Sequence, residues 1–119
     1  MNLIYILTID HPSSVHKCSD YSQFCVNTWK YWCDKHGVDL ITETESDSRF
    51  GNPKWNKLCI TDVGKDYDKI GIIDSDTMVR WDAPNIFELY DDEFCGVPDN
   101  SNLRRLNDSL NVYGKFLPN

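Results

Sequence analysis

Residues 69–79 read KIGIIDSDTMV, an apolar run that passes directly into two aspartates separated by one residue. A short apolar run with a single glycine, bounded by polar residues, is typical of a strand buried on both faces of a parallel sheet. We therefore predict an interior strand over 69–74, with Asp74 and Asp76 at its carboxyl end. Met78 and Val79 are predicted to form a short continuation.

Two further strands are predicted upstream of this run. Residues 2–9 (NLIYILTI) are β-branched and aromatic without a helical period, and residues 38–41 (VDLI) follow the same pattern. Between them, apolar residues recur at steps of three and four, which predicts an amphipathic helix. We expect this helix to be capped near Ser13–Ser14 and to end at Gly37. Its apolar face comprises Cys18, Tyr21, Cys25, Trp29 and Trp32.

A second helix is predicted to begin at Asn52-Pro53, because proline suits the first helical position. Residues 42–52 before it are polar and predict a surface loop, in which Arg49 is the only base. After the two aspartates, residues 83–90 predict a short helix and residues 94–97 (FCGV) a strand. The buried face of the second helix is expected to comprise Trp55, Leu58, Cys59 and Val63.

Alternating strands and helices in this order predict an α/β fold, a mostly parallel sheet flanked by helices. Ligands of such sheets bind outside the carboxyl ends of the strands. Residues 8–10, the Arg49 loop and residues 74–76 should therefore lie along one edge. No repeat or linker divides the chain, so we expect one domain over residues 1–119.

Composition narrows the classes of partner. The 12 Lys and Arg residues against 19 Asp and Glu residues give a net charge of −7, so we expect no nucleic-acid partner. Five cysteines without a metal-binding spacing favour free thiols in a reducing compartment. The apolar residues 1–9 are too few for a signal peptide or a membrane span. We expect a soluble, cytoplasmic protein.

Asp74 and Asp76 are the strongest candidates for chemistry. Two carboxylates separated by one residue at a strand end can share a hard divalent cation, which leaves positions open for phosphate oxygens or water. The alternative is a solvated turn or a helix N-cap. From the residues alone, Lys57 and Arg49 are also explained as exposed charged side chains.

An ordered series of motifs resembles glycosyltransferases with the GT-A fold, particularly the glycogenin-like families. It comprises Lys57-Leu58, Tyr67-x-Lys69 and the strand that ends in the D-x-D-T of residues 74–77. Trp55-x-Lys57, the FCGVPD of residues 94–99 and the amino-terminal IYILTID also fit. The resemblance covers residues 2 to about 99. The overall character of the sequence is similar to that of glycosyltransferase domains of large DNA viruses such as the chlorella viruses. That similarity would imply a location in the host cytoplasm.

The resemblance implies a Rossmann-like GT-A nucleotide-binding half and a hexosyltransferase that takes a UDP-sugar donor. Mn²⁺ or Mg²⁺ would bridge Asp76 to the diphosphate, and Asp74 would serve the ribose, the metal or both. The acceptor would be a glycan or a protein, and no catalytic residue is implied. The resemblance also implies that Thr8, Ile9 and Asp10 hold the uracil and ribose. Lys57 would lie against the donor phosphate or sugar and Arg49 would neutralise the diphosphate; Ser75 is the last implied donor-binding residue.

The sequence departs from that family after residue 99. It contains no Asn-Ser-Gly type motif and no late metal-ligating histidine, so it resembles the donor-binding, amino-terminal part of a longer GT-A domain. Two alternatives stay open. The first is a domain that binds nucleotide and metal without catalysis. The second, more remote, is a haloacid-dehalogenase-like phosphatase, whose motif has threonine where this chain has Met78.

Overall fold

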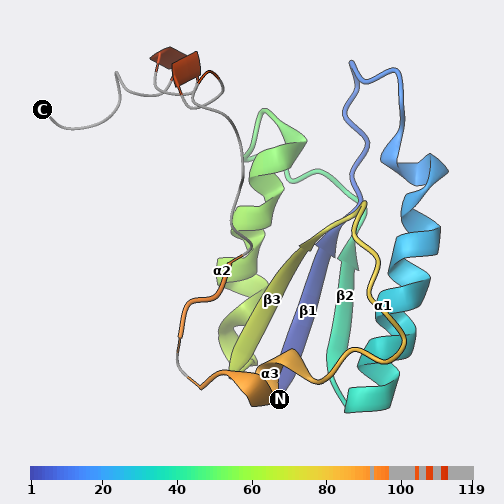
Figure 1. The fold of residues 1–119 in the computed structure, drawn as a ribbon. Helices are drawn as coiled ribbons and strands as arrows, with labels where there is room; N and C mark the ends of the chain where they lie inside the picture. Colours follow the sequence, from blue (N-terminus) through green and yellow to red (C-terminus); the bar gives the residue numbers. More distant parts are fainter. Residues whose placement is uncertain (92, 97–103, 105–106, 109–110, 113–119) are drawn as a thin grey trace, which may run out of the picture.

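A three-stranded parallel sheet forms the centre of the molecule (Figure 1). Strand β1 (Asn2–Leu7) lies between β2 (Asp39–Glu43) and β3 (Lys69–Asp74). All three strands end at the same edge, where the loops that follow them gather. The predicted α/β fold is therefore confirmed. This structure is a computed structural model, and it describes residues 1–91, 93–96, 104, 107–108 and 111–112.

Helix α1 (Ser22–His36) covers one face of the sheet, called here the α1 face. Ile4 and Ile6 of β1 point to this face and are fully buried against the helix. Burial of such side chains is the main source of folding free energy. The helix residues in this core are Trp29, Trp32 and Cys33, with Val38 just beyond the helix.

The two ends of α1 differ in how well the sequence predicted them. Gly37 ends the helix with a φ of 65°, a left-handed conformation that glycine adopts without steric cost, as predicted. The predicted cap at Ser13–Ser14 is wrong, because α1 begins at Ser22 after a 3₁₀ turn, η1 (Cys18–Asp20). Asp10 accepts hydrogen bonds from Ser19 and holds the intervening residues in a loop.

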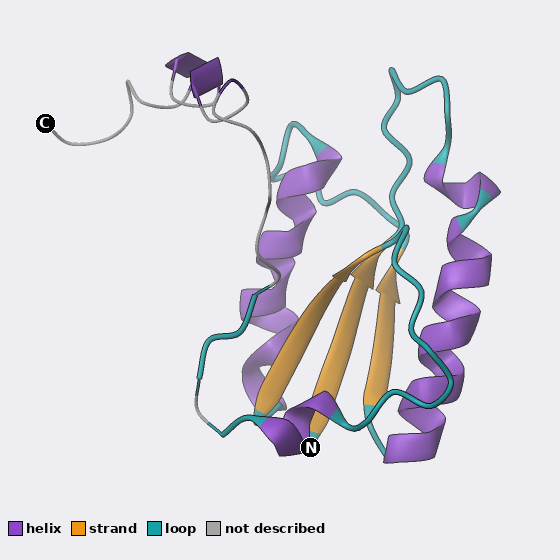
Figure 2. Cartoon of the chain, in the orientation of Figure 1, coloured by secondary structure: helices purple, strands orange, loops and turns teal. Residues whose placement is uncertain are grey.

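The opposite face of the sheet, called here the α2 face, is covered by three short helical segments (Figure 2). These are η2 (Pro53–Cys59), α2 (Ile60–Val63) and η3 (Gly64–Asp66). The predicted buried face was wrong at Trp55 and Leu58, which are 54% and 50% exposed. Side chains of a 3₁₀ helix align every three residues, so Pro53 and Asn56 are buried instead.

Strand β3 is an edge strand in the described part of the chain, whereas the sequence predicted an interior one. Its residues alternate between half-buried and exposed, and Ile72 on the α2 face is 47% exposed. Residues 78–79 and 94–96 are not strands, and Val97 of the second predicted strand lies outside the described residues. The predicted short helix is α3 (Ile86–Leu89).

None of the helices in the described residues is long and apolar enough to cross a membrane. All five cysteines are free thiols.

Candidate functional site

A cleft of about 430 Å³ opens at the carboxyl edge of the sheet. It lies where the loops after β1 and β3 meet the beginning of η2, the edge at which parallel α/β sheets bind ligands. Two lysines and two histidines line it, so nitrogen-bearing side chains gather here in a chain of net charge −7. The lining residues are Leu7, Ile9, His11, Ser14, His16, Cys18, Tyr21, Pro53, Lys54, Lys57, Asp74 and Ser75.

Four of the predicted site residues line this cleft. Ile9 comes from the loop after β1, Lys57 from η2, and Asp74 and Ser75 from the end of β3. The Lys57 ammonium group forms an ion pair with Asp74, although 17 residues separate them. The structure therefore brings together residues that the sequence holds apart.

Four other predicted site residues do not line the cleft. Thr8 directs both its N–H and its hydroxyl to the Glu43 carbonyl and extends the pairing of β1 with β2. Asp10 accepts two hydrogen bonds from Ser19, one from the backbone and one from the side chain, which lower the pKa of its carboxyl group. Asp76 is exposed, two residues beyond Asp74.

Arg49 is the fourth of these residues, and it is engaged elsewhere. Its guanidinium binds Asp47 through Nε and Nη2, at 3.0 Å and 2.8 Å, and reaches Asp62 of α2 at 3.3 Å. The Arg49 hydrogen bonds lower the pKa of Asp47 to about 2. In this arrangement Arg49 fastens the loop before η2 to α2 and does not face the cleft.

The turn that carries the two aspartates is held by α1. The Asp74 carbonyl accepts the Thr77 N–H at 3.0 Å, which closes the turn. The indole N–H of Trp29 donates to the Thr77 carbonyl at 2.9 Å. Trp29 was predicted only as a core residue, and its spacing gave no sign of this second role, because the partner lies 48 residues away.

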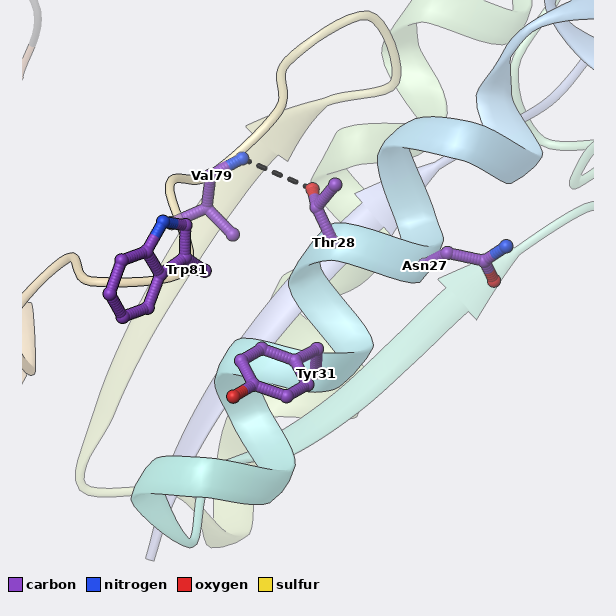
Figure 3. Close-up of a pocket in the computed structure, with 5 residues that line it drawn as sticks. All are labelled: Asn27, Thr28, Tyr31, Val79 and Trp81. Carbon is purple, nitrogen blue, oxygen red and sulfur yellow. Dashed lines mark hydrogen bonds between the residues drawn. The ribbon is translucent and has the colours of Figure 1, made fainter.

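Three more contacts fix the chain that follows the turn. Thr28 accepts the Val79 N–H at 3.1 Å (Figure 3), and the Trp32 indole donates to the Ala83 carbonyl at 3.2 Å. His36 lies 3.2 Å from the same carbonyl. Side chains of α1 thus hydrogen-bond to the backbone of residues 77–83, a segment that forms no strand.

A second hollow lies along this segment, away from the carboxyl-edge cleft. It has a volume of about 350 Å³ and an almost wholly apolar lining. The rings of Tyr31 and Trp81 flank it in Figure 3. Its lining residues are Asn27, Thr28, Tyr31, Val79 and Trp81, none of which also lines the first cleft.

Several cleft residues were missed by the sequence analysis. His11, Ser14 and His16 belong to the loop that follows β1, and Tyr21 precedes α1. The available signal was position, since any loop after a parallel strand reaches the same edge. Ser13 is hydrogen-bonded to His11 Nδ1 at 2.7 Å, which orders the rim of the cleft.

The donor set suits a hard divalent cation held together with a ligand. No group of three or more His, Cys, Asp or Glu side chains gathers among the described residues. Asp74 and Asp76 would therefore supply two carboxylates and leave the other positions to water and phosphate oxygens. Mg²⁺ is commonly held in this way in phosphate-binding sites. Carboxylate oxygens are ligands of the kind that such an ion takes, and of the two aspartates only Asp74 lines the cleft.

Comparison of the chain with protein-family models, with curated proteins and with solved structures found no match.

Proposed function

We propose that this chain is the donor-binding part of a GT-A glycosyltransferase, a hexosyltransferase that takes a UDP-sugar. The observation that carries the proposal is the D-x-D turn at the carboxyl edge of a parallel sheet, beside a cleft lined by Lys54 and Lys57. The motif resemblance supplies the nucleotide and the sugar. The acceptor, a glycan or a protein, would be held by residues not assigned here.

Asp74 and Asp76 would hold the Mn²⁺ or Mg²⁺ ion, which when bound supplies positive charge to the diphosphate leaving group. Lys57 and Lys54 line the cleft beside Asp74, and their ammonium groups would bind phosphate oxygens of the donor. Ile9 and Tyr21 offer apolar surface to a base or ribose. Ser75 adds a hydroxyl at the cleft.

Exclusion of water is modest in this cleft, because Asp74 is 65% exposed and Lys57 39% exposed. Electrostatic stabilisation of a leaving group is strongest in a closed site. Positioning of an acceptor hydroxyl also supplies much of the rate of transfer. We therefore expect this chain to bind the donor better than it transfers sugar, and slow hydrolysis of the donor is the expected residual activity.

The non-catalytic alternative has the same cleft and predicts binding of UDP without transfer to any acceptor. Release of UDP from UDP-sugars, with and without candidate acceptors, separates it from the enzyme. The cytoplasmic location and the absence of a nucleic-acid partner also remain predictions.

Titration calorimetry with UDP tests the proposal directly. UDP should bind in the presence of Mn²⁺, and both chelation and Asp76→Asn should weaken binding by tenfold or more, about the 1.4 kcal/mol of one charge-assisted contact. Asp34→Asn is the matched control, because it makes the same charge change in an exposed aspartate near the far end of α1. Equal affinity in Asp76→Asn and Asp34→Asn, or full affinity in chelator, would overturn the proposal.

A further inference from the structure

The Lys57–Asp74 ion pair places a cation on one of the two carboxylates of the D-x-D turn. Lys57 reaches it from η2, and η2 is fixed by Asn56, which is fully buried. The Asn56 side chain donates to the Pro53 carbonyl at 3.0 Å and accepts the Asp47 N–H. The backbone that carries Lys57 is therefore anchored beside the end of β3, while the Lys57 side chain, a flexible stem that ends in the ammonium group, is 39% exposed.

The neighbouring carboxylate has no such partner. Asp76 makes no hydrogen bond and no ion pair with the described residues, and it is exposed. The two aspartates of the turn are thus unequal: one is already neutralised by the protein and the other is open to an incoming ion.

We propose that Lys57 is a displaceable counter-ion of Asp74. The Lys57 ammonium group stays paired with the Asp74 carboxylate until a divalent cation arrives together with a diphosphate. This inference deepens the proposed function and rests on it for the divalent cation at Asp74 and for the identity of the anion. An ammonium group and a divalent cation in contact with the same carboxylate repel each other, so the binding of one weakens the binding of the other. Lys57 can leave by rotation of its side chain, since no other contact holds the ammonium group in the described residues.

Displacement gives Lys57 a second position in the same cleft. Lys57 and Asp74 both line the cleft, so an ammonium group that leaves Asp74 remains within reach of an anion bound there. A cation alone must displace Lys57 without compensation. A cation that arrives with a diphosphate gives Lys57 new oxygens to bind, which makes the two ligands favour each other's binding.

The test measures Mn²⁺ binding without nucleotide, by the paramagnetic signal of the free ion. Lys57→Met should tighten Mn²⁺ binding by up to about fivefold, the factor that corresponds to one exposed ion pair. Lys54→Met is the matched control: it removes the same charge from the same cleft, and the Lys54 ammonium group makes no ion pair with the described residues. The control should tighten Mn²⁺ binding by less than twofold.

Asp74→Asn shows whether the effect passes through this contact. In that background Lys57→Met should no longer tighten Mn²⁺ binding. Equal gains from the two lysine variants, a gain that survives Asp74→Asn, or no Mn²⁺ binding by any variant would overturn the inference. Circular dichroism of each variant checks that the fold is retained.

UDP provides the second readout. With Mn²⁺ present, Lys57→Met should weaken UDP binding several-fold while it tightens Mn²⁺ binding in the absence of UDP. Failure of the wild-type chain to bind UDP would contradict the proposed function, whereas the Mn²⁺ measurements would still decide whether Lys57 competes at Asp74. Tighter UDP binding by Lys57→Met would overturn the exchange between the two positions.

Discussion

The two faces of the sheet are equally well buried at the central strand β1, where Leu3 and Tyr5 on one face and Ile4 and Ile6 on the other are all fully buried, but they differ at the edge strand β3. On the α1 face, Trp32 and the β1 isoleucines are fully buried, and indole groups also hydrogen-bond to the backbone. On the α2 face, Ile72 is half-exposed and the helical segments that cover it are short. Side chains of α1 therefore position the aspartate turn, whereas Lys57 reaches the turn from η2 on the α2 face, where β3 is less well covered.

The largest expected effect comes from Trp32→Ala. Trp32 is fully buried, contacts the rings of Trp29 and Phe87, and donates to the Ala83 carbonyl. Its removal should lower the free energy of unfolding by about 3–5 kcal/mol, as for other buried aromatic residues. Trp55→Ala on the α2 face should cost less than about 1 kcal/mol, because Trp55 is half-exposed.

Urea denaturation followed by circular dichroism measures both variants. Similar losses in the two would show that the α2 face is as well packed as the α1 face.

Two glycines sharpen the comparison. An added Cβ at Gly71 would lie 2.8 Å from the tip of Ile4, which is fully buried, and 3.5 Å from Phe87. Gly71→Ala should therefore cost about 1–3 kcal/mol through overpacking. At Gly64 the added Cβ would meet the tip of Ile70, which is 37% exposed and has room to move.

Gly64→Ala should accordingly change the free energy of unfolding by less than about 1 kcal/mol. Thermal or urea unfolding of the two variants side by side is the measurement. A larger loss of unfolding free energy in Gly64→Ala than in Gly71→Ala would show that the α2 face is the more tightly packed of the two.

Trp29→Phe tests whether the α1 face positions the aspartates. The variant keeps an aromatic ring in the core but loses the donor to the Thr77 carbonyl, which should cost about 1 kcal/mol. Binding of UDP with Mn²⁺ should weaken several-fold as the turn loosens. Trp81→Phe is the control, since Trp81 is 73% exposed and its indole makes no hydrogen bond in the described residues. Equal effects of the two variants on UDP binding would show that the Trp29 hydrogen bond does not position the turn.

The smallest effect concerns pH. Hydrogen bonds from Arg49 lower the pKa of Asp47 from 3.8 to about 2. Because the folded protein holds the charged form, this stabilisation is present above pH 4 and is lost as the pH falls from about 4 to about 2. Asp47→Asn should flatten the fall of the urea midpoint across that interval, and an unchanged slope would show that the Arg49 contact does not form in solution.

The sequence correctly predicted the helix and the strands whose apolar residues follow a regular pattern. Spacings of three and four fixed the buried residues Cys25, Trp29 and Trp32, and the apolar runs fixed the three strands. It failed at η2, where a 3₁₀ period of three turned Asn56 inward and left Trp55 outside. Over seven residues, the spacing of apolar side chains does not distinguish an α-helix, with a period of 3.6, from a 3₁₀ helix, with a period of three.

The site was predictable only in part, for a related reason. The order of strands predicted Ile9, Asp74 and Ser75 at one edge, and the family resemblance added Lys57; all four residues line the cleft. The partners of polar side chains do not follow from strand order. Arg49 meets Asp47 and Asp62, and Thr8 meets Glu43, through contacts that depend on loop shape.

The central position of β1 has a consequence for how the chain folds during synthesis. β1 is made before β2 and β3, yet Asn2 pairs with Lys69 and Leu7 with Asp74. Parallel pairing over such a distance in sequence closes a long loop and is slow. Until residue 74 has left the ribosome, four residues that end up fully buried, Leu3–Ile6, present an unpaired hydrophobic edge.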